Sequence, residues 1–366
     1  MDVNSNIKKE DGLGSNADVL TLPKTRYRTN NNLLYGIDVL LNCTVFTGLN
    51  MLFWTVTTAL FDYYIYPTDT YLSNWSSTIG GATCMLILSV SQESLLYRIS
   101  RDNARVYLIA SRLYGYLTAC SGILFTRGVT NIYDMYDGTS SESAIYSILI
   151  GYIPLLLLGC TRNLVAPPVC SGQDSEKSYF VVEGYFRSST RQKFNFLLDH
   201  IFSIVVVDAL VVITWRGISN LAANQISPED PKLAAFTICY YGYLVILLCF
   251  ALQYPFFHIS TSSQERHLTK LITEDVFVTM SAFASIFLWK GLWEVFNIYI
   301  VQGNDVSVLW GLNIGAYLLA AVLNISCGLF EPSVDRDGSY ENGDGVLFPI
   351  HYLSCPHNKV EKLKEE

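Results

Sequence analysis

Eight long apolar stretches, separated by short polar segments, constrain this chain more than any other feature of its sequence. They cover residues 35–60, 79–97, 106–130, 144–165, 196–221, 234–257, 272–300 and 306–330. Each is close to the about 20 mostly apolar residues with which a helix spans a bilayer core. Within lipid, only helices and closed barrels satisfy all of the backbone hydrogen bonds. These stretches lack the alternation of polar and apolar residues that barrel strands show. The sequence therefore predicts an all-α polytopic membrane protein with eight transmembrane helices.

The composition supports a membrane protein and excludes several other classes. Hydrophobic residues make up 51% of the chain and charged residues 15%, whereas soluble domains carry about 25% charged residues. The net charge of −8 gives no sign of nucleic-acid binding. The sequence contains no phosphate-binding loop, no His-Glu-x-x-His helix and no metal-spaced cysteines or histidines. We therefore expect the lipid bilayer as partner, no cofactor, no metal and no enzymatic activity.

The distribution of Lys and Arg predicts the topology. These residues concentrate before the first stretch, after the eighth, and in alternate loops, while the other four loops contain only Lys232. Cytosolic loops carry the excess of positive charge, so both termini are predicted to be cytosolic. The sequence Asn-Trp-Ser at Asn74 is an N-glycosylation acceptor. It lies in the first loop predicted to be external, which agrees with this topology.

The chain repeats imperfectly at a shift of about 160 residues, which indicates two halves of four helices. Segments 92–100 and 253–260 are similar, as are 125–128 (Phe-Thr-Arg-Gly) and 288–291 (Leu-Trp-Lys-Gly). An even number of spans gives both halves the same orientation, so the repeat is parallel. The predicted organisation is a disordered cytosolic N-terminal tail (1–32), a first four-helix repeat (33–165), a cytosolic linker (166–195), a second four-helix repeat (196–330) and a cytosolic C-terminal tail (331–366).

A finer repeat of four two-helix hairpins is a second interpretation. Segment 214–217 (Thr-Trp-Arg-Gly) in the fifth stretch resembles the motifs of the third and seventh stretches. The first stretch has Phe-Trp-Thr-Val at 53–56, without the cation or the glycine. Chance similarity among apolar helices is the competing explanation.

Three cations, Arg127, Arg216 and Lys290, occur at a similar depth in odd-numbered stretches, each followed by glycine. Each lies about 30 Å along its helix from the cytosolic start, near the external edge of the bilayer core. One interpretation is a shared polar site that opens outward and takes an anion or an acidic group. The other is that the cations extend to the interface and meet headgroups or nearby acids. Glu294 lies one turn beyond Lys290, which is the spacing of an intrahelical ion pair.

Asp208 is the most buried charge by position, because it lies near the middle of the fifth stretch. A carboxylate at the membrane midplane is costly and usually faces a partner or water. We consider three interpretations: a role in ion or proton coupling, a structural pairing, for example with Arg112 or Lys290, and a protonated, hydrogen-bonded carboxyl.

The eight stretches, the paired halves and the Trp-Arg-Gly and Trp-Lys-Gly motifs resemble the fuseless family of invertebrate multi-pass membrane proteins. The resemblance covers about residues 33–335 and assigns no functional role to the motif residues. It implies a neuronal plasma-membrane protein of presynaptic terminals that supports synaptic transmission. Family members are associated with placing voltage-gated calcium channels at release sites, so such channels or presynaptic scaffold proteins are the expected partners.

Two functions therefore remain open at the level of the sequence. The first is an organiser of a membrane complex, which binds channel or scaffold proteins and which the resemblance favours. The second is a transporter or channel with a polar site formed by odd-numbered helices, near Asp208, Arg216 and Lys290.

Overall fold

The computed structural model describes residues 32–99, 103–170, 174, 179–263, 267–330, 333–340, 343–350 and 352–353. Within these residues the secondary structure is helical and contains no strand. Seven helical segments are long and apolar enough to cross a membrane, and an eighth, α10, is apolar but shorter. The all-α, polytopic class predicted from the sequence is confirmed for this part of the chain.

The helical segments follow the order of the apolar stretches, and three of them contain a π-helical turn. The first segment is α1 (Asn32–Leu41), the π-turn Asn42–Phe46 and α2 (Thr47–Tyr64); it is followed by α3 (Thr70–Arg98), α4 (Ala104–Asp137) and α5 (Ser141–Leu158). The fifth is α6 (Lys193–Phe202), the π-turn Ser203–Asp208 and α7 (Ala209–Gln225); then come α8 (Pro231–Ser262), α9 (His267–Phe296) with the π-turn Asn297–Val301, and α10 (Val306–Val322).

Side chains that cap backbone N–H groups fix the starts of several helices. The Asp69 carboxylate accepts a hydrogen bond from the Leu72 N–H at the start of α3, and the Ser140 hydroxyl accepts one from the Ser143 N–H at the start of α5. Asp230 caps α8, whose first residue is Pro231. Proline suits this position because the first N–H of a helix has no intrahelical acceptor.

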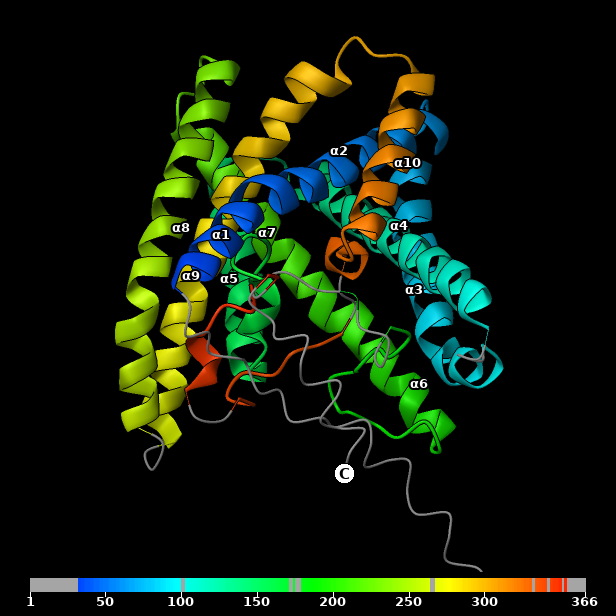
Figure 1. The fold of residues 1–366 in the computed structure, drawn as a ribbon. Coiled ribbons are helices and arrows are strands. Elements are labelled where there is room, and N and C mark those ends of the chain that lie inside the picture. The colour runs from blue at the N-terminus through cyan, green and yellow to red at the C-terminus, as the bar shows by residue number, and fades with distance from the viewer. Residues whose placement is uncertain are drawn as a thin grey trace, which may run out of the picture.

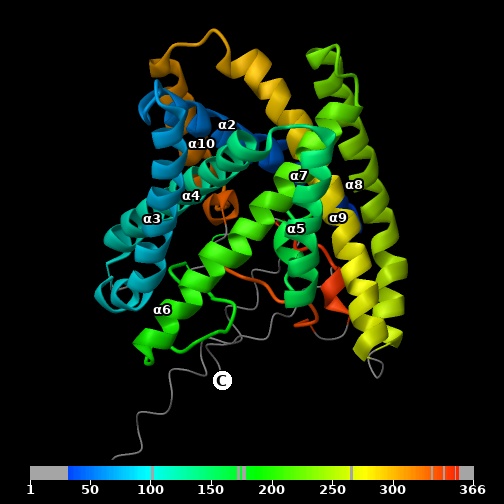
Figure 2. The ribbon, with the colours of Figure 1, turned by 180° about the vertical axis from the view of Figure 1, so that it is seen from behind.

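The helices pack as four antiparallel pairs around a common centre. The most extensive contacts are between α8 and α9, α3 and α4, α5 and α7, and α2 and α10. Figure 1 shows the α8–α9 pair on one side and the α3–α4 pair on the other, with α2 and α7 crossing between them. The reverse view shows α5 beside α7 (Figure 2). Each odd-numbered span therefore pairs with the even-numbered span before it, and the first span pairs with the last.

Glycine allows close backbone contact in three of these four pairs. In the α3–α4 pair, Gly81 lies against the backbone of Phe125, and Gly128 lies against Thr78. In the α8–α9 pair, Gly242 lies against Leu288, and Gly291 against Cys239. The same reciprocal contacts occur in the α5–α7 pair, with Gly151 against Thr214 and Gly217 against Ala144 and Ile148. Small residues at helix contacts are the usual basis of tight packing in membranes.

The fourth and eighth apolar stretches are not continuous helices to their predicted ends. The helix α5 ends at Leu158, where Gly159 adopts a left-handed conformation, and α10 ends at Val322, shortly before Asn324 does the same. A left-handed residue stops an α-helix. The apolar residues that follow form short 3₁₀ helices, Thr161–Leu164 and Ser326–Leu329, which turn back into the bundle. We call the stretches 159–170 and 323–330 the two return segments.

Part of the C-terminal segment predicted as a tail also packs against the bundle. Val334, Val346 and Ile350 are buried, and Val346, Phe348 and Ile350 join a core cluster with Phe277 and Leu288 of α9. The predicted disordered tail, 1–32, lies outside the described residues except for its last position.

Candidate functional site in the central cavity

A cavity of about 840 Å³ lies at the centre of the bundle. Its walls come from the odd-numbered spans (α2, α4, α7 with the π-turn before it, and α9), from the two return segments, and from the C-terminal segment 333–349. Four of the five site residues predicted from the sequence line it, namely Arg127, Asp208, Arg216 and Lys290. The fifth, Glu294, contacts Lys290.

One stripe of the fifth span faces the cavity. Asp208, Val211, Trp215 and Ser219 all line it, and residues spaced by three and four share a helix face. Asp208 is the last residue of the π-turn Ser203–Asp208. Turns of this kind occur frequently at functional sites.

Arg127 is held by one acid and two serines from neighbouring spans. Its Nε donates to the carboxylate of Asp62 at 2.7 Å, and its terminal nitrogens donate to the hydroxyls of Ser77 at 2.7 Å and Ser73 at 2.9 Å. The serines lie one turn apart on α3, and Asp62 lies near the end of α2. The guanidinium is therefore neutralised and oriented within the protein.

Arg216 has the same arrangement in the next pair of helices. Its Nε donates to the carboxylate of Asp134 at 2.8 Å, and its terminal nitrogens donate to the hydroxyls of Ser147 at 2.5 Å and Ser143 at 3.0 Å. It also donates to the carbonyl of Gly138. The serines again lie one turn apart on the preceding even-numbered span, and the acid again lies near the end of the preceding odd-numbered span.

Lys290 departs from this arrangement. Its ammonium group contacts the carboxylate of Glu294 on its own helix at 2.5 Å. All three cations therefore meet nearby acids, as the second interpretation of their sequence pattern expected, and they also line the cavity.

Asp208 has neither of the partners considered from the sequence. Arg112 pairs with Asp174, and Lys290 pairs with Glu294. The two example pairings, with Arg112 and with Lys290, are therefore not formed, because Asp174 pairs with Arg112 and Glu294 pairs with Lys290. The Oδ2 atom of Asp208 is buried and has no hydrogen-bond partner in the part of the chain that the structure describes.

Three tryptophans form a contiguous group in the cavity wall. The ring of Trp289 makes edge-to-face contacts with Trp54 at 5.5 Å and with Trp215 at 5.4 Å between ring centroids. All three indole N–H groups donate to backbone carbonyls of the return segments. The acceptors are Leu329 for Trp54 (2.7 Å), Leu164 for Trp215 (3.2 Å) and Pro167 for Trp289 (2.7 Å).

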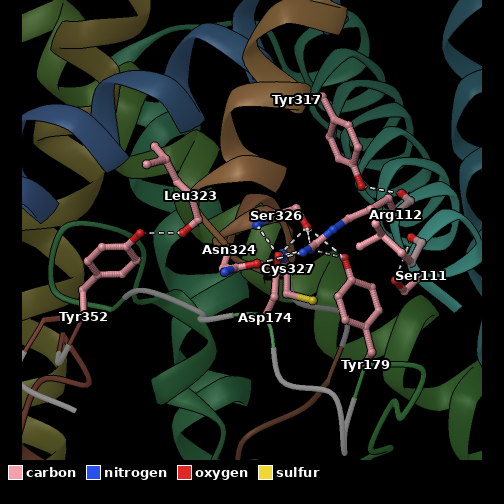
Figure 3. Close-up of polar contacts among 11 residues, drawn as sticks. Ser111, Arg112, Asp174, Tyr179, Tyr317, Leu323, Asn324, Ser326, Cys327 and Tyr352 are labelled. Atoms are coloured by element: carbon pink, nitrogen blue, oxygen red, sulfur yellow. Dashed lines mark hydrogen bonds and ion pairs between the residues drawn. The ribbon is translucent and has the colours of Figure 1, made fainter. Parts of the chain in front are cut away.

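Each return segment is anchored by an aspartate from outside it. Asp174 accepts hydrogen bonds from the backbone N–H groups of Ser326 (3.2 Å) and Cys327 (2.7 Å), and from the Ser326 hydroxyl (2.8 Å). Figure 3 shows Asp174 among these groups, together with Arg112 and Tyr179. Burial raises the pKa of Tyr179 above its ordinary value, so its hydroxyl stays protonated.

The other return segment is anchored in the same way. Asp337 accepts hydrogen bonds from the backbone N–H groups of Thr161 (2.8 Å) and Arg162 (3.0 Å), and from the Thr161 hydroxyl (2.9 Å). Thus an aspartate that follows the first four spans anchors the end of the eighth, and one that follows the last span anchors the end of the fourth.

Sequence reasoning did not identify these anchors or the return segments. The similar placement of Thr161-Arg162 and Ser326-Cys327 near the ends of the fourth and eighth stretches was the available signal. Long-range hydrogen bonds to Asp174 and Asp337 leave no periodic pattern in a sequence. The tryptophans could be recognised in the repeated motifs, but the backbone carbonyls that accept hydrogen bonds from their indole N–H groups could not.

Asn74, the predicted glycosylation position, lies in the first turns of α3 and is buried. Its amide nitrogen has no hydrogen-bond partner in the described part of the chain. A glycan requires an accessible nitrogen, so this position is unfavourable in the folded chain. Glycosylation of Asn74 stays a prediction.

Comparison with known proteins gives one match. The family model described as Fuseless matches residues 33–330, which includes nearly all of the described helices and both return segments. No curated protein and no solved structure matches the chain. The family resemblance predicted from the sequence is confirmed.

Proposed function

The chain belongs to the Fuseless family, and on that premise we propose that it is a multi-pass protein of the presynaptic plasma membrane. In this proposal it supports synaptic transmission by localising voltage-gated calcium channels, directly or through presynaptic scaffold proteins. Support comes from the family match and from the seven helices that are long and apolar enough to cross a membrane. The role is one of binding and requires no catalysis.

Rescue of neurons that lack the chain tests this role. Wild-type protein is expected to restore the density of voltage-gated calcium channels at release sites, measured by immunolabelling and presynaptic calcium imaging. An organiser should also restore it when Asp208 is replaced by Asn, because Asp208 lines the internal cavity and is not among the exposed side chains. A normal channel density in neurons without the chain would contradict the proposal.

The geometry favours a second candidate function, the binding and passage of a small solute through the central cavity. One observation carries it: Arg127, Asp208, Arg216 and Lys290, from three different spans, line a single cavity. Charged groups within membrane spans are costly and usually face a substrate path or a partner. The two return segments close the same cavity with their carbonyl groups and apolar side chains.

Tracer flux and whole-cell current in a null cell line test the second function. We expect a flux in cells with surface-confirmed wild-type protein and its loss in Asp208→Asn and Lys290→Gln forms. Glu229→Gln, which removes an exposed carboxylate outside the cavity, is the matched control and should retain the flux. Absence of flux across broad ion and metabolite panels, with normal surface delivery, would contradict passage and leave the organiser role.

We further propose a parallel 4+4 repeat with both termini in the cytosol. The repeat is supported by the corresponding anchors Asp174 and Asp337, and by the shared left-handed ends at Gly159 and Asn324. The topology is supported by the Lys and Arg distribution. Under this topology the return segments lie on the cytosolic side of the cavity.

A further inference from the structure

Within the part of the chain that the structure describes, one acidic side chain of the cavity wall lacks a partner. The lining residues of the described chain include Arg127, Arg162, Arg216 and Lys290 as cations, and Asp134, Asp208 and Asp335 as acids. Every one of these except Asp208 has a hydrogen bond or an ion pair from its side chain. The buried Oδ2 of Asp208 has none. An unpaired buried carboxylate is costly, so a cationic ligand would be stabilised there.

Part of the wall of this cavity is aromatic. Trp54, Trp215 and Trp289 line the cavity, and their N–H groups are already used by the return segments. These indole N–H groups are therefore not available as hydrogen-bond donors to a ligand. The faces of aromatic rings carry partial negative charge and attract cations, and tryptophan does so most strongly.

The cations in the wall do not prevent binding of a positively charged ligand. Arg127, Arg216 and Lys290 are each paired with an acid, and the pairs are Asp62 at 2.7 Å, Asp134 at 2.8 Å and Glu294 at 2.5 Å. Arg162 donates to the Gly345 carbonyl and stacks over the ring of Tyr340 at 4.5 Å. Arg162 has no acid partner in the described part of the chain, and its buried Nε has no hydrogen-bond partner there. Asp208 is the lining acid of that part of the chain without a hydrogen bond or ion pair.

A metal ion fits this arrangement poorly. Calcium takes six to eight oxygen ligands, and magnesium demands near-octahedral geometry. The described residues contain no group of three or more His, Cys, Asp or Glu side chains that could hold a metal ion. One carboxylate beside aromatic rings suits an ammonium group instead, because an ammonium group needs one charge partner and tolerates an apolar surround.

We propose that the central cavity binds a small organic cation, with its ammonium group at the Asp208 carboxylate and its apolar part against Trp215 and Trp289. The Asp208 carboxylate lies about two helical turns from Trp215 on the same face of the fifth span. The cavity volume of about 840 Å³ is within the range of small-molecule sites. The inference rests on the proposed solute function and names the chemical class of the solute. Its test is a direct binding measurement, which does not depend on flux.

The test uses the full-length chain in lipid nanodiscs and equilibrium dialysis with labelled phenethylammonium and tetraethylammonium. Labelled 3-phenylpropionate is the probe of opposite charge. We expect saturable binding of at least one cation and no saturable binding of the carboxylate probe. Asp208→Asn is expected to weaken cation binding at least about tenfold, because it removes the charged acceptor. Asp208→Glu, which keeps the charge, should retain part of the binding.

Two control variants locate the site. Glu229→Gln removes a carboxylate outside the cavity, and Trp310→Leu removes a partly exposed tryptophan of α10, also outside it. Both should bind like the wild type, whereas Trp215→Leu should bind about threefold to tenfold more weakly through loss of an aromatic contact with the apolar part of the ligand. Thermal melting of each variant confirms that it is folded.

The outcomes separate this inference from the proposed solute function. The inference would be overturned if the wild-type protein bound neither cation. It would also be overturned if the Asp208→Asn variant bound the cations as tightly as the wild type does. Preferential binding of 3-phenylpropionate would overturn it in favour of an anion site. Cation binding without any flux would uphold the inference and contradict passage of a solute. Flux of another solute without cation binding would uphold passage and contradict the inference.

Discussion

Replacing Asp134 with Asn is expected to destabilise the folded chain by about 3–5 kcal/mol, because it leaves a buried guanidinium without its counterion. The Arg216 side chain is 0% exposed, and Asp134, at 32%, is the acid paired with it. The Asn side chain keeps a hydrogen-bond acceptor near Arg216 but removes the charge. Thermal unfolding of the purified chain in a fixed detergent measures the loss.

The equivalent pair in the preceding helices provides a matched control. Asp62, the partner of Arg127, is 59% exposed. The Arg127 side chain is itself buried, at 6%, but water can reach the position of so exposed a carboxylate and partly replace it, so the loss is expected to be about 1 kcal/mol. Asp62→Asn should therefore lower stability much less than Asp134→Asn. Equal losses at the two positions would show that burial does not determine the strength of these pairs.

Replacing Gly81 with Ala is expected to cost about 1–3 kcal/mol through overpacking. A Cβ atom at this position would lie 2.5 Å from the backbone nitrogen of Phe125 and 2.8 Å from the carbonyl oxygen of Ser121. Backbone atoms cannot rotate away as the end of a side chain can, so α3 and α4 must separate. The midpoint of thermal unfolding should fall accordingly.

The adjacent glycine is the natural control for this change. At Gly80 the nearest atom to a new Cβ is a side-chain carbon of Leu124 at 3.8 Å, which is ordinary contact. Gly80→Ala should leave stability unchanged or raise it by up to about 1 kcal/mol, because alanine favours the helix. Similar melting of the two variants would contradict the close α3–α4 contact.

The helices and much of the candidate site could be predicted because both depend on local pattern. The length and apolar composition of membrane helices identify them in a sequence. Cations within such helices are rare, so Arg127 and Arg216 could be recognised as candidate site residues. The intrahelical pair of Lys290 and Glu294 follows from helical spacing alone, and the structure confirms it.

The remaining features could not be predicted because they depend on contacts between distant segments. The apolar residues after Gly159 and Asn324 looked like continued helix, since hydropathy does not distinguish a membrane span from a segment buried inside the protein. The environment of Asp208 could not be predicted either, because the cavity that it lines is formed by several spans and both return segments. The aspartates Asp62 and Asp134 gave no sign of which cation they would meet.

The most direct test of the central claim, that the odd-numbered spans surround a solvent-accessible cavity, is cysteine labelling in intact cells. Ser219→Cys lines the cavity, whereas Ile145→Cys lies on the outer face of α5, near the level of Gly217. Both are made in a Cys170→Ser background, because Cys170 also lines the cavity. A charged, membrane-impermeant thiosulfonate is predicted to modify Ser219→Cys and to leave Ile145→Cys unmodified. Failure to modify Ser219→Cys, or equal modification of both, would contradict the cavity and the functions proposed for it.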